Sequence, residues 1–198
     1  MYRDSYDVII LAGGNSTRFG VDKCDFEIDG RTMLERVASS FQSPIIVTDK
    51  SRQVNGTVIH DNEKMGPLHA IKLAMRAVSS GKVFVTGCDF PYISRNLVSH
   101  LCKQPEFVGT TLTDGEFQPL LACYNTSYLM KAVQKSNSLI EVILSSPSVY
   151  IAGFREIEML DPSLLTLVNI NRVTDFWNKP KRFWVTRIIG NTERIFVL

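Results

Sequence analysis

A glycine-containing segment near the start of the chain carries residue types suited to binding phosphate. It follows an apolar run and reads LAGGNSTRFG over residues 11–20, with Lys23 shortly beyond it. Glycine permits positive φ and close approach of a ligand to the backbone, and successive N–H groups in such a turn form an anion-binding nest. Arg18 and Lys23 add positive charge. The segment therefore indicates a phosphate-binding loop, with a glycine-rich turn and solvated basic side chains as the plainer alternative.

The spacing differs from both of the common glycine motifs that bind phosphate. A Walker A loop has lysine directly after its second glycine, whereas Val21 and Asp22 separate Gly20 from Lys23. The GxGxxG pattern of dinucleotide-binding folds is absent as well. Neither motif therefore identifies the ligand.

A carboxylate with a suitable position for chemistry is Asp89, which follows the apolar run 83–87. Open α/β sheets bind ligands at the carboxyl ends of their strands, and a carboxylate there can hold Mg²⁺ together with phosphate oxygens. From the residues alone, Asp89 could equally cap the turn that leads to Pro91.

Strands and helices alternate along the first half of the chain. Four apolar runs predict buried strands, at residues 8–11, 45–47, 58–59 and 83–87. A helix over residues 33–41 begins with a capping box of Thr32 and Glu35. Another helix opens at Gly66-Pro67 and is closed by Gly81. The alternation predicts right-handed βαβ crossovers and hence an α/β, doubly wound, Rossmann-like fold with a mostly parallel sheet.

The second half of the chain is less regular. Ser94 is a candidate cap for a helix that carries Leu97, Val98 and Leu101. Further helices are predicted at residues 128–133, 139–144 and 173–177, and further strands at residues 120–124, 149–151 and 165–170. No repeat or linker interrupts this pattern.

The end of the chain has the pattern of a β-hairpin. Residues 183–189 and 192–198 are rich in β-branched and aromatic side chains and flank Gly190-Asn191. Glycine at the first central position of a two-residue loop is typical of a type II′ turn. Because an isolated hairpin is only marginally stable, we expect one main domain over residues 1–180. Residues 181–198 would form a hairpin extension that packs on this domain or on a partner.

The composition is that of an ordinary soluble globular protein. Of 198 residues, 44% are hydrophobic and 21% are charged, and the net charge of +2 is too small to indicate a nucleic-acid surface. The apolar run that ends at Gly13 is too short to span a membrane. The four cysteines form no CxxC pair, so reduced, structural thiols in a cytoplasmic protein are expected.

The glycine segment resembles the signature LAGG-x-S-x-R-x-G-x-D-K of the MobA-like nucleotidyltransferases and matches it at every fixed position. The resemblance also includes the sequence CDFPYI at residues 88–93 and the GPL turn at residues 66–68, and it extends over about residues 8–177. It implies a nucleotide-diphospho-sugar-transferase-like fold. One departure is Thr48, where relatives often have asparagine.

The resemblance implies a set of functional residues. Arg18 and Lys23 would neutralise charge on the phosphates and the leaving pyrophosphate, and Asp89 would bind Mg²⁺. The complete implied nucleotide site is Leu11, Ala12, Gly13, Gly14, Ser16, Arg18, Lys23, Asp61, Gly66, Pro67 and Asp89.

The acceptor side of the implied site has two parts. The resemblance assigns Gln118-Pro119 to it, together with Asn169 and Asn171. Two asparagines spaced by two residues point to the same side of a strand and could hydrogen-bond a pterin or its phosphate. They could equally satisfy backbone groups where that strand ends.

The reaction that the resemblance implies is transfer of GMP from GTP to a molybdopterin-type cofactor, with release of pyrophosphate. Transfer of CMP to the same or another phosphorylated acceptor is an alternative, as is a non-catalytic nucleotide-binding module. The expected partners are GTP and the acceptor, with neither nucleic acid nor membrane. A homodimer or a partner in molybdoenzyme maturation is left open.

Overall fold

The computed structural model describes residues 6–14, 22–113 and 115–171. Ser16, Arg18, the predicted short helix at residues 173–177 and the predicted hairpin at residues 181–198 lie outside the described residues. The proposed division of the chain at residue 180 therefore stays a prediction.

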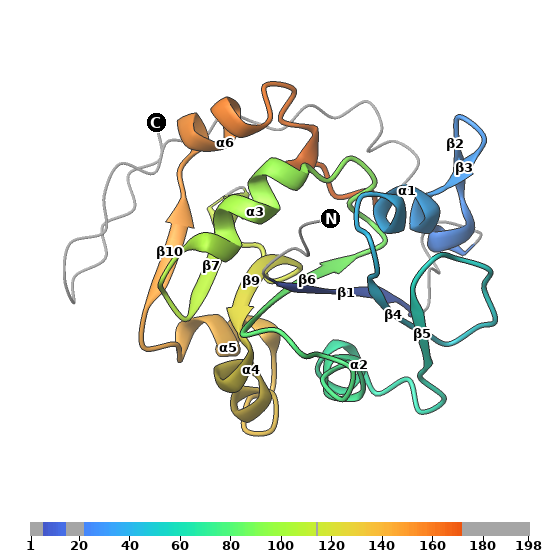
Figure 1. Ribbon diagram of the computed structural model, residues 1–198, viewed down its shortest axis with the longest axis horizontal. Coiled ribbons are helices and arrows are strands. Elements are labelled where there is room, and N and C mark those ends of the chain that lie inside the picture. Colours follow the sequence, from blue (N-terminus) through green and yellow to red (C-terminus); the bar gives the residue numbers. More distant parts are fainter. Residues whose placement is uncertain (1–5, 15–21, 114, 172–198) are drawn as a thin grey trace.

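A mixed sheet of eight strands forms the centre of the protein (Figure 1). The strand order is β5-β4-β1-β6-β9-β7-β10, and β8 pairs with β7. Their bounds are β1 (Asp7–Ala12), β4 (Ile45–Thr48), β5 (Thr57–His60), β6 (Lys82–Gly87), β7 (Val108–Thr113), β8 (Glu116–Phe117), β9 (Leu121–Asn125) and β10 (Val149–Ala152). A separate two-stranded hairpin consists of β2 (Glu27–Ile28) and β3 (Arg31–Thr32).

The four strands predicted in the first half form the parallel part of the sheet. Strand β1 pairs in parallel with β4 and β6, and β4 pairs in parallel with β5. Their carboxyl ends therefore lie along one edge. Strand β10 pairs in parallel with β7, whereas β9 runs antiparallel to β6 and β7, and β8 runs antiparallel to β7. The prediction of a mostly parallel sheet is therefore confirmed, with two reversed strands.

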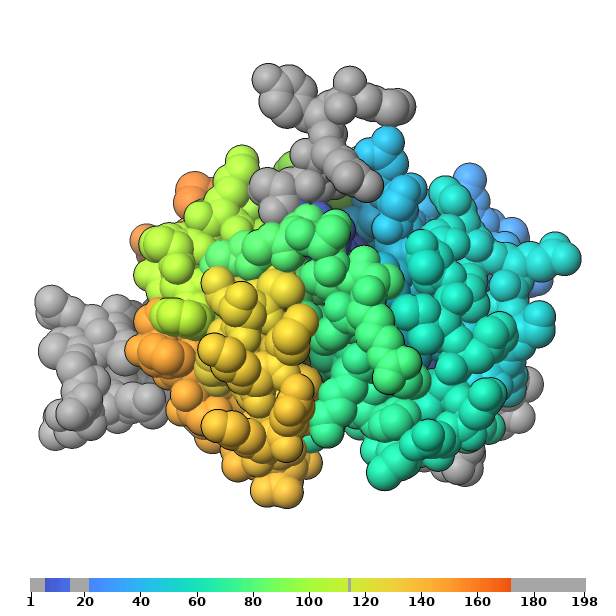
Figure 2. All heavy atoms as spheres, turned by 60° about the horizontal axis from the view of Figure 1, so that its bottom comes forward, coloured from blue at the N-terminus to red at the C-terminus, as the bar shows by residue number. Residues whose placement is uncertain are grey.

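Helices cover both faces of the sheet, as expected for a doubly wound fold (Figure 1). One layer contains α1 (Met33–Ser39), α3 (Arg95–Lys103) and α6 (Phe154–Leu160), and the other contains α2 (Pro67–Ala74), α4 (Thr126–Ala132) and α5 (Leu139–Leu144). Figure 2, with the second layer turned forward, shows α4 and α5 (yellow to orange) beside α2 (green). None of the helices in the described ranges is long and apolar enough to cross a membrane.

Helix α1 illustrates how local sequence sets an element in place. The Thr32 hydroxyl accepts the N–H of Glu35 at 3.1 Å, and the Glu35 carboxylate accepts the N–H of Thr32 at 2.8 Å, which confirms the capping box. The apolar stripe of the helix is buried: Val37 is fully inaccessible in the core against the sheet, and Met33 is fully inaccessible in a small cluster with Val168 and Ile170. Burial of each such side chain contributes roughly 1.5–3 kcal/mol.

Two predicted elements differ from the structure. Helix α2 ends at Ala74 rather than near Gly81, because the following backbone hydrogen bonds tighten from i−4 to i−3 spacing. Residues 165–170 do not form a strand: Leu165–Leu167 is a short 3₁₀ helix, η2. The Asp161 carboxylate accepts the N–H groups of Ser163 and Thr166, and such local side-chain bonds compete with extended structure.

The expectation of reduced cysteines is wrong. Cys24 is bonded to Cys88 and Cys102 to Cys123, with Cα–Cα distances of 5.5 and 5.2 Å. The pairs are separated by 64 and 21 residues in sequence, so spacing gives no sign of them. Since disulfides are uncommon in the cytosol, the cysteines no longer support the expectation of a cytoplasmic location.

The Cys102–Cys123 bond joins α3 to β9, and its loss should lower the free energy of unfolding. Closing a loop of this length restricts the unfolded chain by about 3 kcal/mol. We therefore expect Cys102→Ala to unfold at lower denaturant than the oxidised parent protein. The comparison is then repeated in reductant, where the parent should lose this advantage. An equal difference under both conditions would show that packing, not the crosslink, is responsible.

Candidate functional site

A cavity of about 290 Å³ lies at the carboxyl ends of the parallel strands. It is bounded by residues that follow β1, β4, β5 and β6, by the start of α2 and by the approach to β9. The lining consists of Leu11, Gly13, Gly14, Lys23, Val47, Thr48, Asp49, Asp61, Lys64, Gly66, Pro67, Ala70, Gly87, Asp89 and Leu120. The structure thus brings together eight residues of the implied nucleotide site from four separate segments.

Lys23 and Asp89, which both line this cavity, form an ion pair. The Lys23 Nζ atom lies 3.0 Å from Oδ2 of Asp89, and the two side chains are 19% and 12% exposed. Lys23 belongs to a short 3₁₀ helix, η1 (Lys23–Asp25), whereas Asp89 follows β6. Lys23 also donates to the side-chain oxygen of Asn171 at 3.1 Å. One residue from the acceptor-side prediction is therefore joined directly to the nucleotide-side lysine.

The second carboxylate oxygen of Asp89 is buried and has no hydrogen-bond partner among the described residues. Gly87 makes this position accessible: a Cβ atom at Gly87 would lie only 2.1 Å from Oδ1 of Asp89. The described residues contain no cluster of three or more histidine, cysteine or acidic side chains suited to a metal. A single carboxylate with one unpaired oxygen fits Mg²⁺ held mainly by phosphate oxygens and water.

Arg52 organises the site, although nothing in the sequence patterns singled it out. Its side chain is 7% exposed. Its guanidinium donates to the Ala12 carbonyl at 2.5 Å, to the Thr48 hydroxyl, to Asp22 at 2.6 Å and to Asp25 at 2.9 Å. It therefore ties the ends of β1 and β4 to the segment that carries Lys23. Only the tertiary structure brings these partners together.

Asp22 is the anionic counterpart in this network. Burial raises the pKa of its carboxyl, but hydrogen bonds from Lys50 and from the Cys24 N–H, with the charge of Arg52, hold the pKa below its usual value. Asp22 also caps η1 by accepting the Cys24 N–H at 3.0 Å. A carboxylate that remains charged thus fixes the start of the turn that presents Lys23.

The Cys24–Cys88 disulfide lies beside the ion pair. Each cysteine directly adjoins one of its members, since Cys24 follows Lys23 and Cys88 precedes Asp89. Both sulfur-bearing side chains are buried, with exposed fractions of 4%. The covalent bond therefore connects the backbone segments on which the two charged groups are carried.

The loop between β5 and α2 forms the far wall of the cavity. Asp61 is 7% exposed, and its Oδ1 accepts the N–H groups of Glu63 and Lys64 at 3.2 and 3.0 Å. Gly66 has φ 93°, a conformation that favours glycine, and lies just before Pro67 at the start of α2. Asp61 is thus engaged in shaping its own turn, a role that its sequence position did not indicate.

The implied acceptor residues are only partly gathered at the cavity. Gln118 and Pro119 do not line it, although the next residue, Leu120, does. The carbonyls of Gln118 and Pro119 accept hydrogen bonds from the hydroxyls of Thr110 and Tyr124. The prediction that Asn169 and Asn171 share one side of a strand is wrong, because no strand forms there. The Asn169 side-chain oxygen is nevertheless buried without a partner in the described structure, and Ile170 N–H donates to the Asp89 carbonyl at 2.8 Å.

The remaining predicted residues have separate positions. Ala12 is fully buried and contributes its carbonyl to Arg52 rather than a side chain to the cavity. Ser16 and Arg18 lie outside the described residues, so their roles stay predictions.

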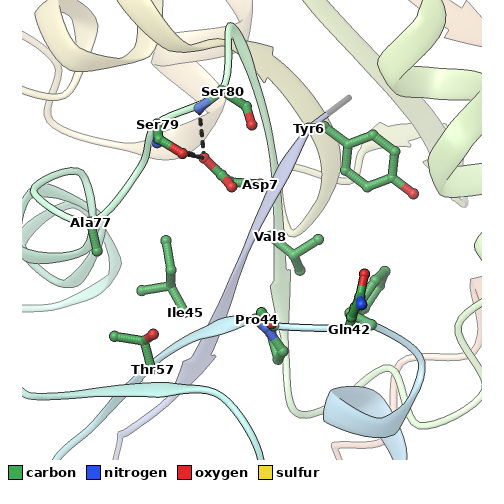
Figure 3. A pocket seen from close by; sticks show the side chains of 12 residues that line it. Tyr6, Asp7, Val8, Gln42, Pro44, Ile45, Thr57, Ala77, Ser79 and Ser80 are labelled. Carbon is green, nitrogen blue, oxygen red and sulfur yellow. Dashed lines mark hydrogen bonds between the residues drawn. The ribbon is translucent and has the colours of Figure 1, made fainter. Parts of the chain in front are cut away.

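A second hollow of similar volume lies at the amino ends of β1 and β4, opposite the strand-end cavity (Figure 3). Its acidic residue, Asp7, accepts the N–H groups of Ser79 and Ser80 at 2.6 and 2.7 Å. None of the unpaired buried polar atoms in the described ranges belongs to its lining. The strand-end cavity is therefore the stronger candidate for a functional site.

Comparison with known protein families shows which family the chain belongs to. The family described as "MobA-like NTP transferase domain" matches residues 8–148. The chain belongs to this family. The matched range contains β1 from its second residue, strands β2 to β9, the Lys23–Asp89 pair and the strand-end cavity. This MobA-like chain therefore carries its candidate site in the family domain.

Curated relatives of this MobA-like protein have modest sequence identity. A protein of Methanosarcina acetivorans named "Probable molybdenum cofactor guanylyltransferase" is 26% identical over 200 residues, covering 86% of this chain and 88% of its own length. A protein of the same name from Aquifex aeolicus is 28% identical over 180 residues, covering 84% and 86%.

Solved structures establish the fold of this MobA-like chain. Molybdopterin-guanine dinucleotide biosynthesis protein A from Archaeoglobus fulgidus superimposes with a TM-score of 0.70 at 23% identity, covering 85% of this chain and 94% of that protein. The 2-C-methyl-D-erythritol 4-phosphate cytidylyltransferase from Thermus thermophilus gives a TM-score of 0.56 at 16% identity, covering 74% and 87%. The nucleotidyltransferase-like α/β fold is thereby confirmed.

Arg52 should contribute to stability in a pH-dependent way. Removing its charge in Arg52→Met leaves Asp22, whose side chain is 13% exposed, with the half-exposed Lys50 as its remaining cationic partner, which should cost about 3 kcal/mol at neutral pH. Because the folded-state pKa of Asp22 is lowered, this contribution is present above about pH 4 and is lost as the pH falls through the folded pKa. Denaturant unfolding from pH 7 to pH 3 should therefore show a smaller difference between the parent and the variant at the acid end, where the Arg52 bonds to the Ala12 carbonyl and the Thr48 hydroxyl remain.

The matched control for this experiment is Lys50→Met, which removes the other cation that contacts Asp22. The Lys50 side chain is 52% exposed, and exposed ion pairs contribute little. We expect a much smaller loss than for Arg52→Met. A loss for Arg52→Met that stays constant across the pH range would contradict the role assigned to the Asp22 charge.

Proposed function

We propose that this protein transfers GMP from GTP to a molybdopterin-type acceptor and releases pyrophosphate. The observation that carries the proposal is the Lys23–Asp89 pair, which lies at the ends of parallel strands beside the glycine segment and keeps one carboxylate oxygen unpaired. The names of the curated relatives support molybdopterin chemistry. Family membership supports nucleotidyl transfer as the reaction class.

The proposed step forms one bond and breaks another at the α-phosphorus. An oxygen of the acceptor phosphate attacks this atom in line, the bond to the bridging oxygen of the β-phosphate breaks, and that oxygen keeps the electron pair as pyrophosphate leaves. A phosphate oxygen needs no general base. Positioning and charge neutralisation supply most of the acceleration in such transfers.

Different residues of this chain would supply the positioning and the charge neutralisation. Lys23, which lines the cavity, would exchange its contact with Asp89 for a contact with the phosphates as negative charge builds on the leaving group. Asp89 would hold Mg²⁺ through its unpaired oxygen, and the metal when bound supplies further charge neutralisation on the phosphates. Arg52 and the disulfide keep the backbone of both residues in place. The Asn171 side-chain oxygen accepts a hydrogen bond from Lys23, and Asn171 is proposed to contact the molybdopterin-type substrate.

Two other functions deserve comparison. A cytidylyltransferase is the alternative within the same fold, which the Thermus thermophilus enzyme shares, whereas the guanylyltransferase names of the curated relatives favour GTP. A non-catalytic nucleotide-binding module would need no charged pair at the phosphate site. The pairing of Lys23 with Asp89 in the cavity lining supports an enzyme.

The first test is pyrophosphate release with molybdopterin-type acceptor and each of the four triphosphates in magnesium buffer. We expect GTP to support turnover in preference to ATP, CTP and UTP. Omission of the acceptor gives the background of triphosphate hydrolysis. Preferential turnover of CTP would favour the cytidylyltransferase, and binding without turnover of any triphosphate would favour the non-catalytic module.

The second test addresses the charged pair. Asp89→Asn should fold normally and reduce turnover by about 10²-fold or more, because a charge-stabilising group is lost. Lys23→Ala should lower kcat by a similar factor, about 3 kcal/mol of transition-state stabilisation. Lys103→Ala, at the end of α3 and away from the cavity, is the matched control. A change in KM alone for Lys23→Ala would indicate uniform binding and remove the catalytic role proposed for it.

A further inference from the structure

Asp49 lines the strand-end cavity and has one carboxylate oxygen without a hydrogen-bond partner. It directly follows β4, and its side chain is only 7% exposed. Within the described part of the chain, its Oδ1 atom has no hydrogen-bond partner. Native proteins pair nearly all buried polar atoms. An unpaired carboxylate oxygen in the wall of a ligand cavity therefore indicates a ligand that donates a hydrogen bond to it.

The loop between β5 and α2 holds this carboxylate in place. Lys64 Nζ lies 3.0 Å from Oδ2 of Asp49. Lys64 has φ 53°, in the left-handed region, and its N–H donates to Oδ1 of Asp61 at 3.0 Å. Asp61 thus stabilises the turn that presents Lys64, and Lys64 in turn fixes Asp49. An ionised carboxylate has about four lone-pair directions, so Oδ2 can still accept a second hydrogen bond.

The preceding residue cannot supply the same contact. Thr48 is fully buried, and its hydroxyl is engaged with the Arg52 guanidinium and with the backbone of Lys50. Asp49 is therefore the polar side chain with spare acceptor capacity at the end of β4.

We propose that Asp49 selects the nucleobase by accepting hydrogen bonds from the N1–H and the 2-amino group of guanine. This inference rests on the proposed function, because it assumes a nucleoside triphosphate in the cavity. A carboxylate offers only acceptors. Guanine presents two adjacent N–H donors on its Watson–Crick edge, whereas adenine and cytosine place a ring-nitrogen lone pair beside their amino group. Uracil has a single N–H on that edge. Guanine alone satisfies both carboxylate oxygens.

The unaltered protein provides the first measurement. Inosine 5′-triphosphate lacks the 2-amino group of GTP and is otherwise the same purine nucleotide. Calorimetric titration in magnesium buffer without acceptor should show ITP binding roughly 10- to 100-fold more weakly than GTP, as expected when a hydrogen bond to a buried charged group is lost. Equal affinities for GTP and ITP would overturn the contact with the 2-amino group without any variant being made.

The second measurement reverses the preference. Asp49→Asn keeps the shape of the side chain but replaces one acceptor with an N–H donor. Xanthosine 5′-triphosphate has a carbonyl in place of the 2-amino group of GTP. The variant should lose GTP affinity roughly 10- to 100-fold and gain XTP affinity. The ratio of its GTP affinity to its XTP affinity, the GTP:XTP ratio, should therefore fall by at least about 100-fold. A residue that only braces the loop would weaken both nucleotides equally and leave this ratio unchanged.

Two further variants separate base recognition from structure. Asp29→Asn makes the same chemical change at a carboxylate that is 87% exposed on the β2–β3 hairpin, and the GTP:XTP ratio should match that of the parent protein. Lys64→Met removes the brace while leaving Asp49, so GTP should bind more weakly with GTP still preferred over XTP. Thermal unfolding of each variant establishes that it is folded.

The outcomes distinguish this inference from the function on which it rests. If the parent protein prefers GTP and turns it over, but Asp49→Asn has the same GTP:XTP ratio, the assignment of Asp49 is wrong and the function stands. If the parent protein binds and turns over CTP in preference to GTP, the proposed GTP specificity fails, and the role of Asp49 in reading guanine fails with it.

Discussion

The arrangement of the site depends on one buried guanidinium, that of Arg52. Arginine carries five N–H donors in a fixed fork and remains charged in proteins, so burying it requires acceptors in fixed directions. Here they come from the ends of β1 and β4 and from the carboxylates on either side of Lys23. The requirement to satisfy one buried cation therefore determines where the lysine stands relative to the sheet.

The position of Lys23 in turn constrains the position of Asp89, which follows β6. Lys23 reaches its carboxylate directly, and the Cys24–Cys88 bond connects the adjoining backbone segments. Gly87 lets the carboxylate lie against the chain, where a larger residue would collide with it. Preorganised charges avoid the cost of reorientation during a reaction. The residues that hold Lys23 and Asp89 are therefore as important to the site as the two charged groups themselves.

The sequence alone was sufficient for the elements that depend on local patterns. Apolar runs predicted the four parallel strands and the strand-end position of Asp89. The Thr32 and Glu35 pair predicted the capping box. Partners distant in sequence could not be predicted, because no local pattern records them: the two disulfides, the acceptors of Arg52 and the pairing of Asp49 with Lys64 exist only in three dimensions. The error at residues 165–170 has another cause, since apolar content was taken for a strand where the Asp161 carboxylate stabilises a turn.

The reversal of β9 has a consequence for how this molecule can diverge in evolution. Leu121, at the start of β9, pairs with Thr86 near the end of β6, so the antiparallel strand delivers its preceding loop, not its following one, to the cavity. The segments that follow the parallel strands and the segment that precedes β9 thus lie at the same edge of the sheet. Insertions or deletions between β8 and β9 can reshape one wall without shifting the register of the parallel strands. The side of the cavity formed by the segments after the parallel strands and the side formed by the segment before β9 can therefore vary independently. The ligand group bound on one side can change while the group bound on the other side stays the same.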